Sequence, residues 1–278
     1  MLSLYHDFSE NASKKITHVY STSFTLGIKL LDKKFHNHIY NIYGLVRLAD
    51  EIVDTFHDHD KKQLIDEFEE ETFLAIERGL STNPIIHAYQ LTANKYKIDN
   101  KLLSGFFESM KMDLYQIDYD EKNYKEYIYG SAEVVGLLCL QIFTEGDKAQ
   151  YEKLKPGAKA LGAAFQKVNF LRDMQADFQE RGRTYFPGVD FVNFSASEKA
   201  LIEKDILDDF EAARLSILEL PKSSSVGVYL AYKYYLKLFN KIQKAPAEAI
   251  LKQRFRVPNF EKFYLFGITY FRSTLGLI

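Results

Sequence analysis

The sequence has very little cysteine and almost no net charge. One cysteine, Cys139, occurs in 278 residues, so no intramolecular disulfide can form and a reducing compartment is expected. Lysine and arginine number 36 against 38 aspartates and glutamates, which leaves a formal net charge of −2. A chain without a basic surplus lacks the electrostatic attraction that nucleic-acid-binding proteins use, so no nucleic acid is expected as a partner.

Long hydrophobic runs are absent too. No stretch reaches the roughly 18 consecutive apolar residues of a membrane-spanning helix. Near the N-terminus, Asp7 and Glu10 interrupt the apolar residues, and the basic start and apolar core of a secretory signal are missing. We therefore expect a cytoplasmic protein. Peripheral contact with the inner face of the membrane stays open as an alternative.

Glycine and proline are scarce, with 14 and 6 residues, and the alternating patterns typical of strands are rare. Apolar residues instead recur with a period of about 3.6 along nearly the whole chain, which is the spacing of a helix with one buried face. The sequence therefore predicts an all-α protein. The predicted helices cover residues 9–24, 36–56, 61–78, 84–95, 99–115, 123–144, 147–178, 195–219, 222–243 and 262–276.

One segment, "YGLVRLADEIVD" at residues 43–54, sets charged residues into such an apolar pattern. On an ideal helix Arg47, Asp50 and Asp54 lie within an arc of roughly 60°, and the two aspartates stand at positions i and i+4. A single pair of this kind is usually part of a solvated helix flank. A second pair on another helix would change that interpretation.

Such a second pair occurs in "FQKVNFLRDMQADFQERGRTYFP", residues 165–187. Two helices that face each other with these pairs would concentrate four carboxylates in an apolar interior, which is costly without cations. Magnesium, with Mn²⁺ as the alternative ion, resolves this cost because it binds through carboxylates and substrate phosphates. The polar residues that share an arc of roughly 80° on this helix are Gln166, Asn169, Asp173 and Asp177.

Neighbouring residues extend this arrangement into a site for an anionic ligand. Asn169 would add a neutral oxygen ligand to the metal. Arg47 and Arg172 would hold an anionic group, since arginine contacts phosphate in a bidentate manner. A diphosphate is therefore the implied ligand.

The two aspartate segments resemble the aspartate-rich signatures of the squalene and phytoene synthases, which are head-to-head prenyl transferases. The resemblance spans nearly the whole chain and leans towards the bacterial phytoene synthases. It implies one isoprenoid-synthase-type helical bundle over residues 1–278, with a central apolar cavity. Further matching segments are "STSF" at 21–24, "SMKMDLYQ" at 109–116, "YIYGSAEVVG" at 127–136, and "RFRV" at 254–257 with the following Lys262.

The activity implied by the resemblance is the condensation of two geranylgeranyl diphosphates to phytoene, a step of carotenoid biosynthesis, with release of diphosphate. The first alternative is condensation of C15 farnesyl diphosphate to dehydrosqualene or squalene; NADPH is not expected as a cofactor. A class I terpene cyclase is disfavoured because both metal segments read DxxxD, and a non-catalytic helical assembly factor is disfavoured because all four aspartates are present. The implied metal ligands are Asp50, Asp54, Asn169, Asp173 and Asp177.

The resemblance also implies residues for substrate and chemistry. Tyr129 is the candidate for proton removal, and aromatic rings near the motifs would stabilise carbocations. The chain has Ser131 and Glu133 where the family often has valine and glycine, so Tyr127 and Tyr129 both stay candidates. The implied substrate-binding residues are Ser21, Phe24, Arg47, Tyr127, Gln166, Asn169, Arg172, Tyr185 and Arg254, with Arg256 as an alternative to Arg254.

The C-terminal segment, residues 263–278, is apolar and aromatic with few charges. We expect it to pack into the bundle rather than lie against lipid. The hydrocarbon product that the resemblance implies has no polar group, which makes release into a membrane physically reasonable. The sequence leaves the oligomeric state open.

Overall fold

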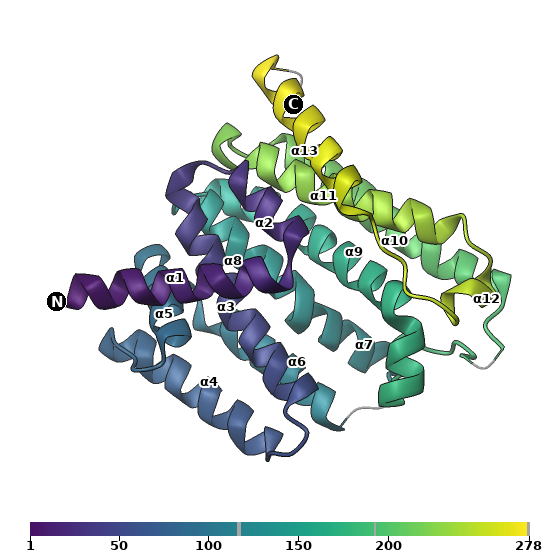
Figure 1. The fold of residues 1–278 in the computed structure, drawn as a ribbon, viewed down its shortest axis with the longest axis horizontal. Helices are drawn as coiled ribbons and strands as arrows, with labels where there is room; N and C mark the ends of the chain where they lie inside the picture. Colours follow the sequence, from purple (N-terminus) through teal and green to yellow (C-terminus); the bar gives the residue numbers. More distant parts are fainter. Residues whose placement is uncertain (116–117, 192, 277–278) are drawn as a thin grey trace.

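The computed structural model describes residues 1–115, 118–191 and 193–276 (Figure 1). This part of the chain is built from helices, with one isolated parallel β-bridge between Asp118 and Thr184. The all-α prediction is confirmed. In chain order the elements are α1 (Leu2–Tyr20), α2 (Thr22–Lys29), α3 (Lys33–Thr55), α4 (Lys61–Arg78), α5 (Pro84–Tyr96), α6 (Asn100–Tyr115), α7 (Glu121–Ile128), the π-helical turn η1 (Tyr129–Glu133), α8 (Val134–Phe143), α9 (Lys148–Arg181), α10 (Ala196–Leu218), α11 (Lys222–Gln243), α12 (Ala247–Ile250) and α13 (Asn259–Thr274).

Local capping chemistry explains most helix starts. The side chains of Asp60 and Asp147 accept hydrogen bonds from backbone N–H groups of the first turns of α4 and α9, which satisfies donors that have no partner within the helix. Ser195 and Glu198 form a reciprocal capping box at the start of α10.

The predicted helix at 9–24 is wrong in its bounds. It is divided into α1, which begins at Leu2, and α2, because Ser21 adopts an extended backbone (φ −146°, ψ 102°). The Ser21 hydroxyl then caps α2 by accepting from Phe24 N at 3.2 Å. A serine whose side chain competes for backbone hydrogen bonds can thus interrupt an otherwise continuous apolar period.

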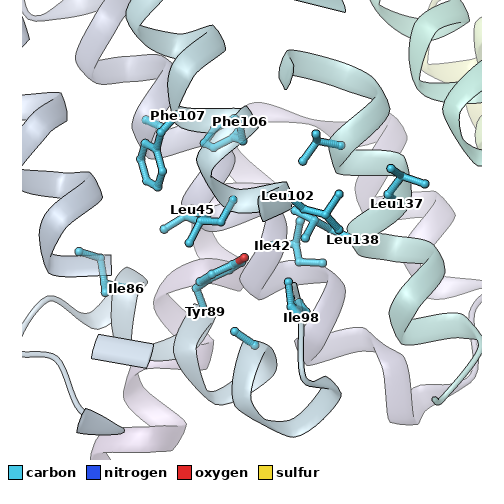
Figure 2. Packing of buried hydrophobic residues seen from close by; sticks show 14 of the residues in the cluster. Ile42, Leu45, Ile86, Tyr89, Ile98, Leu102, Phe106, Phe107, Leu137 and Leu138 are labelled. Atoms are coloured by element: carbon cyan, nitrogen blue, oxygen red, sulfur yellow. The ribbon is translucent and has the colours of Figure 1, made fainter. Parts of the chain in front are cut away.

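Two clusters of buried apolar residues stabilise the fold. The first joins α3, α4, α5, α6 and α8, and Figure 2 shows its rings and aliphatic side chains packed between these helices around Leu45, Tyr89 and Phe106. The second joins α7, α9, α10, α11 and α12. Val228 on α11 packs against both clusters, so α11 links the two halves of the core.

The C-terminal helix α13 packs on α11 and α2 (Figure 1). Leu265 and Phe266 contact the small cluster of Leu26, Leu230 and Tyr234, and Tyr234 donates to Lys262 O at 2.7 Å. Helix α13 therefore packs on the bundle as predicted, but only through the side that faces α11 and α2, and its opposite side is exposed. The large side chains exposed there are Phe260, Phe263, Tyr264, Ile268, Tyr270, Phe271 and Leu275. Residues 277 and 278 lie outside the described residues.

No helix in the described part of the chain combines the length and the apolar character needed to cross a bilayer.

Candidate active site

The first acidic pair lies in the C-terminal half of α3. Arg47, one turn earlier, forms ion pairs with Asp50 and with Glu51, and its guanidinium carbon lies 4.2 Å from the ring centroid of Tyr20. The helical spacing i, i+3 and i+4 brings these charges together. The positive charge of Arg47 therefore compensates the carboxylates of its own helix in this structure.

The second acidic pair lies near the C-terminal end of α9. Arg172 Nε donates to Asp173 Oδ1 at 3.0 Å, and Arg254 Nε lies 2.7 Å from the same oxygen. Asp177, one turn later, is buried. The structure thus brings the predicted residues Arg172 and Arg254 together at Asp173, although Arg254 is 81 residues away in the sequence.

More cations gather near Arg172 from the C-terminal part of the chain. Burial and the positive charges of Arg172 and Arg256 lower the pKa of Lys262. Arg256 itself contributes its backbone carbonyl to Lys241 Nζ at 2.9 Å. The second pair therefore has a surplus of positive charge beside it, as binding of an anion requires.

Arg183, which follows α9, connects the two acidic segments. Its Nη1 lies 3.1 Å from Asp54 Oδ1, and its backbone N–H donates to Asp177 O at 2.9 Å. Its Nη2 donates to the backbone carbonyl of Asp113 at 2.6 Å. Sequence reasoning did not select Arg183, although it stands in the segment "RGRTYFP" that carries part of the resemblance.

Asp113, at the end of α6, is a second residue that sequence reasoning did not select. Its buried carboxylate accepts from Tyr127 at 2.7 Å and lies 3.4 Å from the hydroxyls of Tyr119 and Tyr185. Burial raises the pKa of Asp113 to about 7, against the opposing effects of the Arg183 charge and the Tyr127 hydrogen bond. Tyr185 also stacks on Phe170, with ring centroids 4.0 Å apart.

Tyr129 belongs to a different set of contacts. Its side chain is 37% exposed, and Lys159 Nζ lies 5.4 Å from its ring centroid. Lys159 Nζ in turn lies 2.8 Å from a carboxylate oxygen of Glu133. Glu133, which departs from the family pattern, therefore forms an ion pair with Lys159. Of the two candidate tyrosines, Tyr127 is the one placed in the buried cluster next to Arg183.

An apolar pocket of about 300 Å³ lies between α2, α3, η1, α8, α9, α10 and α11. Phe165 and Tyr235 stack in its wall with ring centroids 3.8 Å apart, and the ring of Phe24 lies 5.5 Å from that of Tyr43. The aromatic rings of Phe24, Tyr43 and Phe165, which lie near the sequence motifs, thus line one pocket.

The pocket has a polar end on α9. Gln166 and Asn169 line it, and Asn169 precedes Asp173 by one helical turn, so the pocket wall continues towards the second acidic pair. Tyr235 donates to Asn169 Oδ1 at 3.3 Å. Tyr235 was not selected from the sequence, because an aromatic residue at helical spacing is indistinguishable from ordinary core.

The oxygen ligands predicted for a metal come from α3 and α9. In the described part of the chain, no three His, Cys, Asp or Glu side chains are grouped closely enough to hold a metal ion. Arginines contact the carboxylates of Asp50, Asp54 and Asp173 instead. The donor set still fits Mg²⁺ in its chemistry, because it consists of carboxylate and amide oxygens.

Curated proteins of similar sequence include phytoene and diapophytoene synthases. Phytoene synthase 1 from Solanum lycopersicum is 26% identical over 283 residues, covering 91% of this chain and 66% of that protein. A 4,4'-diapophytoene synthase from Staphylococcus haemolyticus is 28% identical over 196 residues, covering 68% of this chain and 66% of that protein. The chain thus spans slightly less than two thirds of the length of these relatives.

The fold is similar to that of solved structures as well. A crystal structure of a dehydrosqualene synthase in complex with a ligand superposes with a TM-score of 0.81 at 20% identity, covering 96% of this chain and 98% of that one. The sequence model described as squalene/phytoene synthase matches residues 17–261. The chain belongs to the squalene/phytoene synthase family.

Proposed function

We propose that this protein condenses two allylic prenyl diphosphates head to head, and that geranylgeranyl diphosphate is the substrate and phytoene the product. The observation that carries the proposal is the position of an aromatic-lined apolar pocket next to Asn169 and Asp173, with Arg172 and Arg254 on that aspartate. Such a site offers an apolar space for a prenyl chain and cations for its diphosphate. The active unit is one domain over residues 1–278.

The acidic pairs would hold Mg²⁺ through Asp50, Asp54, Asp173, Asp177 and Asn169. When bound, the metal would neutralise the charge that develops on the leaving diphosphate. Arg172 and Arg254 would contact the diphosphate oxygens directly, with Lys262 beside them. Arg47 on α3 and Ser21 at the start of α2 would also contact the substrate.

The pocket would exclude water from the reacting carbon atoms. Carbocations are captured rapidly by water, so a dry wall prevents this side reaction. The ring faces of Phe24, Tyr43 and Phe165 would stabilise the cation through their quadrupoles. The condensation of two prenyl diphosphates to one polyene releases two diphosphate ions and two protons, and it consumes no reductant, so NADPH is not required.

The second candidate is condensation of two C15 farnesyl diphosphates to dehydrosqualene. The relative from Staphylococcus haemolyticus named a 4,4'-diapophytoene synthase favours this candidate. Both candidate reactions would use the same acidic pairs. They differ in the length of pocket that the prenyl chain of the substrate would occupy.

Release of the hydrocarbon product would use the exposed aromatic side of α13. This helix packs on α2 and α11, which both line the pocket. We propose that this side contacts the lipid surface peripherally, so that the product passes from the pocket to the membrane over a short distance. A cytoplasmic protein at the inner face of the membrane is the location that fits this exit.

The deciding experiment incubates the purified protein and Mg²⁺ separately with C15 and C20 allylic diphosphates, with and without NADPH. Extracted hydrocarbons are identified by chromatography and mass spectrometry. A C40 product from the C20 substrate without NADPH supports the proposal, and a C30 product selects the second candidate. A cyclic product of unchanged carbon number indicates a terpene cyclase, and no product from either substrate indicates a non-catalytic assembly factor.

A further inference from the structure

A buried ionic cluster lies beside the proposed metal ligands and contacts one of them, Asp54, through Arg183. It consists of Asp113, Arg183 and the hydroxyls of Tyr119, Tyr127 and Tyr185. The tyrosines come from three separate parts of the chain: the segment after α6, helix α7, and the segment after α9. Burial of such charges costs several kcal/mol per ion before pairing, and apolar residues of similar volume often stabilise a core as well or better. Stability alone is therefore a weak reason for this cluster.

The guanidinium of Arg183 is shared between two carboxylates. Its Nη1 lies 3.1 Å from Asp54 Oδ1 and 3.6 Å from Asp113 Oδ1. Its Nη2 is held by the Asp113 backbone carbonyl at 2.6 Å. Although burial opposes the charged form, the negative charges of Asp113 and Asp54 raise the pKa of Arg183, so it stays a cation.

A cation next to Asp54 competes with any divalent metal for that carboxylate. The competition weakens if a second anion pairs with the same guanidinium, because the buried cation then keeps a partner when a metal takes Asp54. Asp113 is placed to be that anion. Its own orientation is fixed by the short hydrogen bond from Tyr127.

We propose that Asp113 is a positioning residue that shares the Arg183 guanidinium with Asp54, so that Arg183 keeps a buried partner when a divalent cation binds the first acidic pair. This inference rests on the proposed metal-dependent function. In this inference Asp113 acts on the metal site through Arg183 and contacts neither the metal nor the substrate itself. The buried phenols are the support that keeps the Asp113 carboxylate in place.

The experiment measures Mn²⁺ binding to the purified full chain by titration of the electron paramagnetic resonance signal of free Mn²⁺. It is done at pH 8, above the Asp113 pKa of about 7. The variants are Asp113→Asn, Arg183→Gln and the double variant. Asp113→Asn should raise the Kd for Mn²⁺ about tenfold, within the range known for residues that orient metal ligands.

Coupling between the two residues is the decisive readout. In the Arg183→Gln background, the same Asp113→Asn change should raise the Kd by less than about twofold, because the competing cation is gone. An equal, tenfold rise in both backgrounds would contradict the proposal and indicate that Asp113 acts by its own charge or by structure. An unchanged Kd in the Asp113→Asn single variant would also overturn it.

Asp209→Asn is the matched control. Asp209, on α10, is a partly buried carboxylate that lies 2.7 Å from Lys167 Nζ of α9, in a different cluster. Its substitution removes one partner of the buried Lys167 and should lower the midpoint of a thermal melt, while leaving the Kd for Mn²⁺ within about twofold of wild type. A tenfold rise in this variant as well would show a general effect of lost stability and would overturn the assignment to Asp113.

Two outcomes separate this inference from the proposed function. If the wild-type protein forms hydrocarbon and binds Mn²⁺ but Asp113→Asn binds it equally well, the inference alone fails. If the wild-type protein neither forms product nor binds Mn²⁺, the proposed function fails. Should Asp113→Asn not fold, Arg183→Gln carries the test, because its Kd must be equal to or lower than that of wild type, and a higher Kd contradicts the proposal.

Discussion

The two acidic pairs receive their compensating charge from different places. The first pair, on α3, is contacted by Arg47 of the same helix and by Arg183, a buried residue 129 positions away. The second pair, on α9, is contacted by Arg172 of the same helix and by Arg254, whose side chain is 50% exposed. Arg183, the cation that reaches the first pair from outside its helix, is therefore fixed in the core. Arg254, the corresponding cation of the second pair, lies on an exposed segment before α13.

This difference indicates how the site would work. A buried ion pair is held by its surroundings, whereas an exposed pair exchanges partners at small cost. We therefore expect the first pair to act as a fixed wall and the second pair as the side where a diphosphate enters and displaces Arg254 from Asp173.

The largest effect is expected at the aspartates themselves. Asp50→Asn and Asp173→Asn should each abolish turnover, because an amide keeps the shape of the side chain but lacks the charge that binds Mg²⁺. Helical content, measured by circular dichroism, should stay at the wild-type level. Chelation with EDTA should have the same effect on the wild-type protein. Retained turnover in both variants would exclude the metal assignment.

The next largest effect is expected for Tyr127 rather than Tyr129. Tyr127→Phe removes a hydrogen bond to a charged, buried group, which is worth about 1.5–3 kcal/mol. It should lower both the midpoint of thermal unfolding and kcat. Tyr129→Phe keeps the ring next to Lys159 and should cost clearly less on both measures. A larger loss of kcat in Tyr129→Phe would return the chemistry to the residue selected from the sequence.

Arg254 and Arg172 should differ in how they affect kinetics. Arg254→Gln should raise KM roughly tenfold with a smaller change in kcat, because an exposed cation mainly assists binding of the anion. The KM of the wild-type protein should also rise with ionic strength more steeply than that of the variant. Arg172→Gln, which alters a more buried contact with Asp173, should lower kcat as well. Equal effects on kcat in both variants would remove the distinction between them.

The smallest effect is expected at the exposed side of α13. The double substitution Phe263→Ser and Phe271→Ser removes two large exposed rings and leaves the contacts of Leu265 and Phe266 intact. Binding to lipid vesicles in a flotation assay should fall several-fold, since buried apolar area drives interfacial binding. Turnover in detergent should stay within about twofold of wild type. Unchanged flotation would show that another surface meets the membrane.

Much of the fold was predictable because helices leave a local record in the sequence. The apolar period marks α3, α4, α5, α6, α10 and α11 closely, and the caps at Asp60, Asp147 and Ser195 mark starts. The break at Ser21 was not predictable from the period, because a serine fits both inside a helix and at its cap. The exposed aromatic side of α13 was missed because hydrophobicity alone does not say which side finds a partner.

From residue spacing alone, the site was predictable only where its residues share a helix, and Arg254 was a candidate only through the resemblance to the family. Asp50 with Arg47, and Asp173 with Arg172, follow from i to i+4 spacing. The contacts of Arg183 with Asp113 and Asp54 join residues that are 70 and 129 positions apart, so a single sequence carries no local signal for them. Tyr127 and Tyr129 differ by two positions and so point about 160° apart on an ideal α-helix. Only the packed structure shows which of them is buried.

The most direct test of the central claim is the ratio of diphosphate released to hydrocarbon formed, measured together for the wild-type protein with the C20 substrate and Mg²⁺. Head-to-head condensation predicts two diphosphates for each hydrocarbon molecule, and a hydrocarbon of C40. A ratio of one with a C20 product would contradict the account, because it would show that each substrate reacts alone.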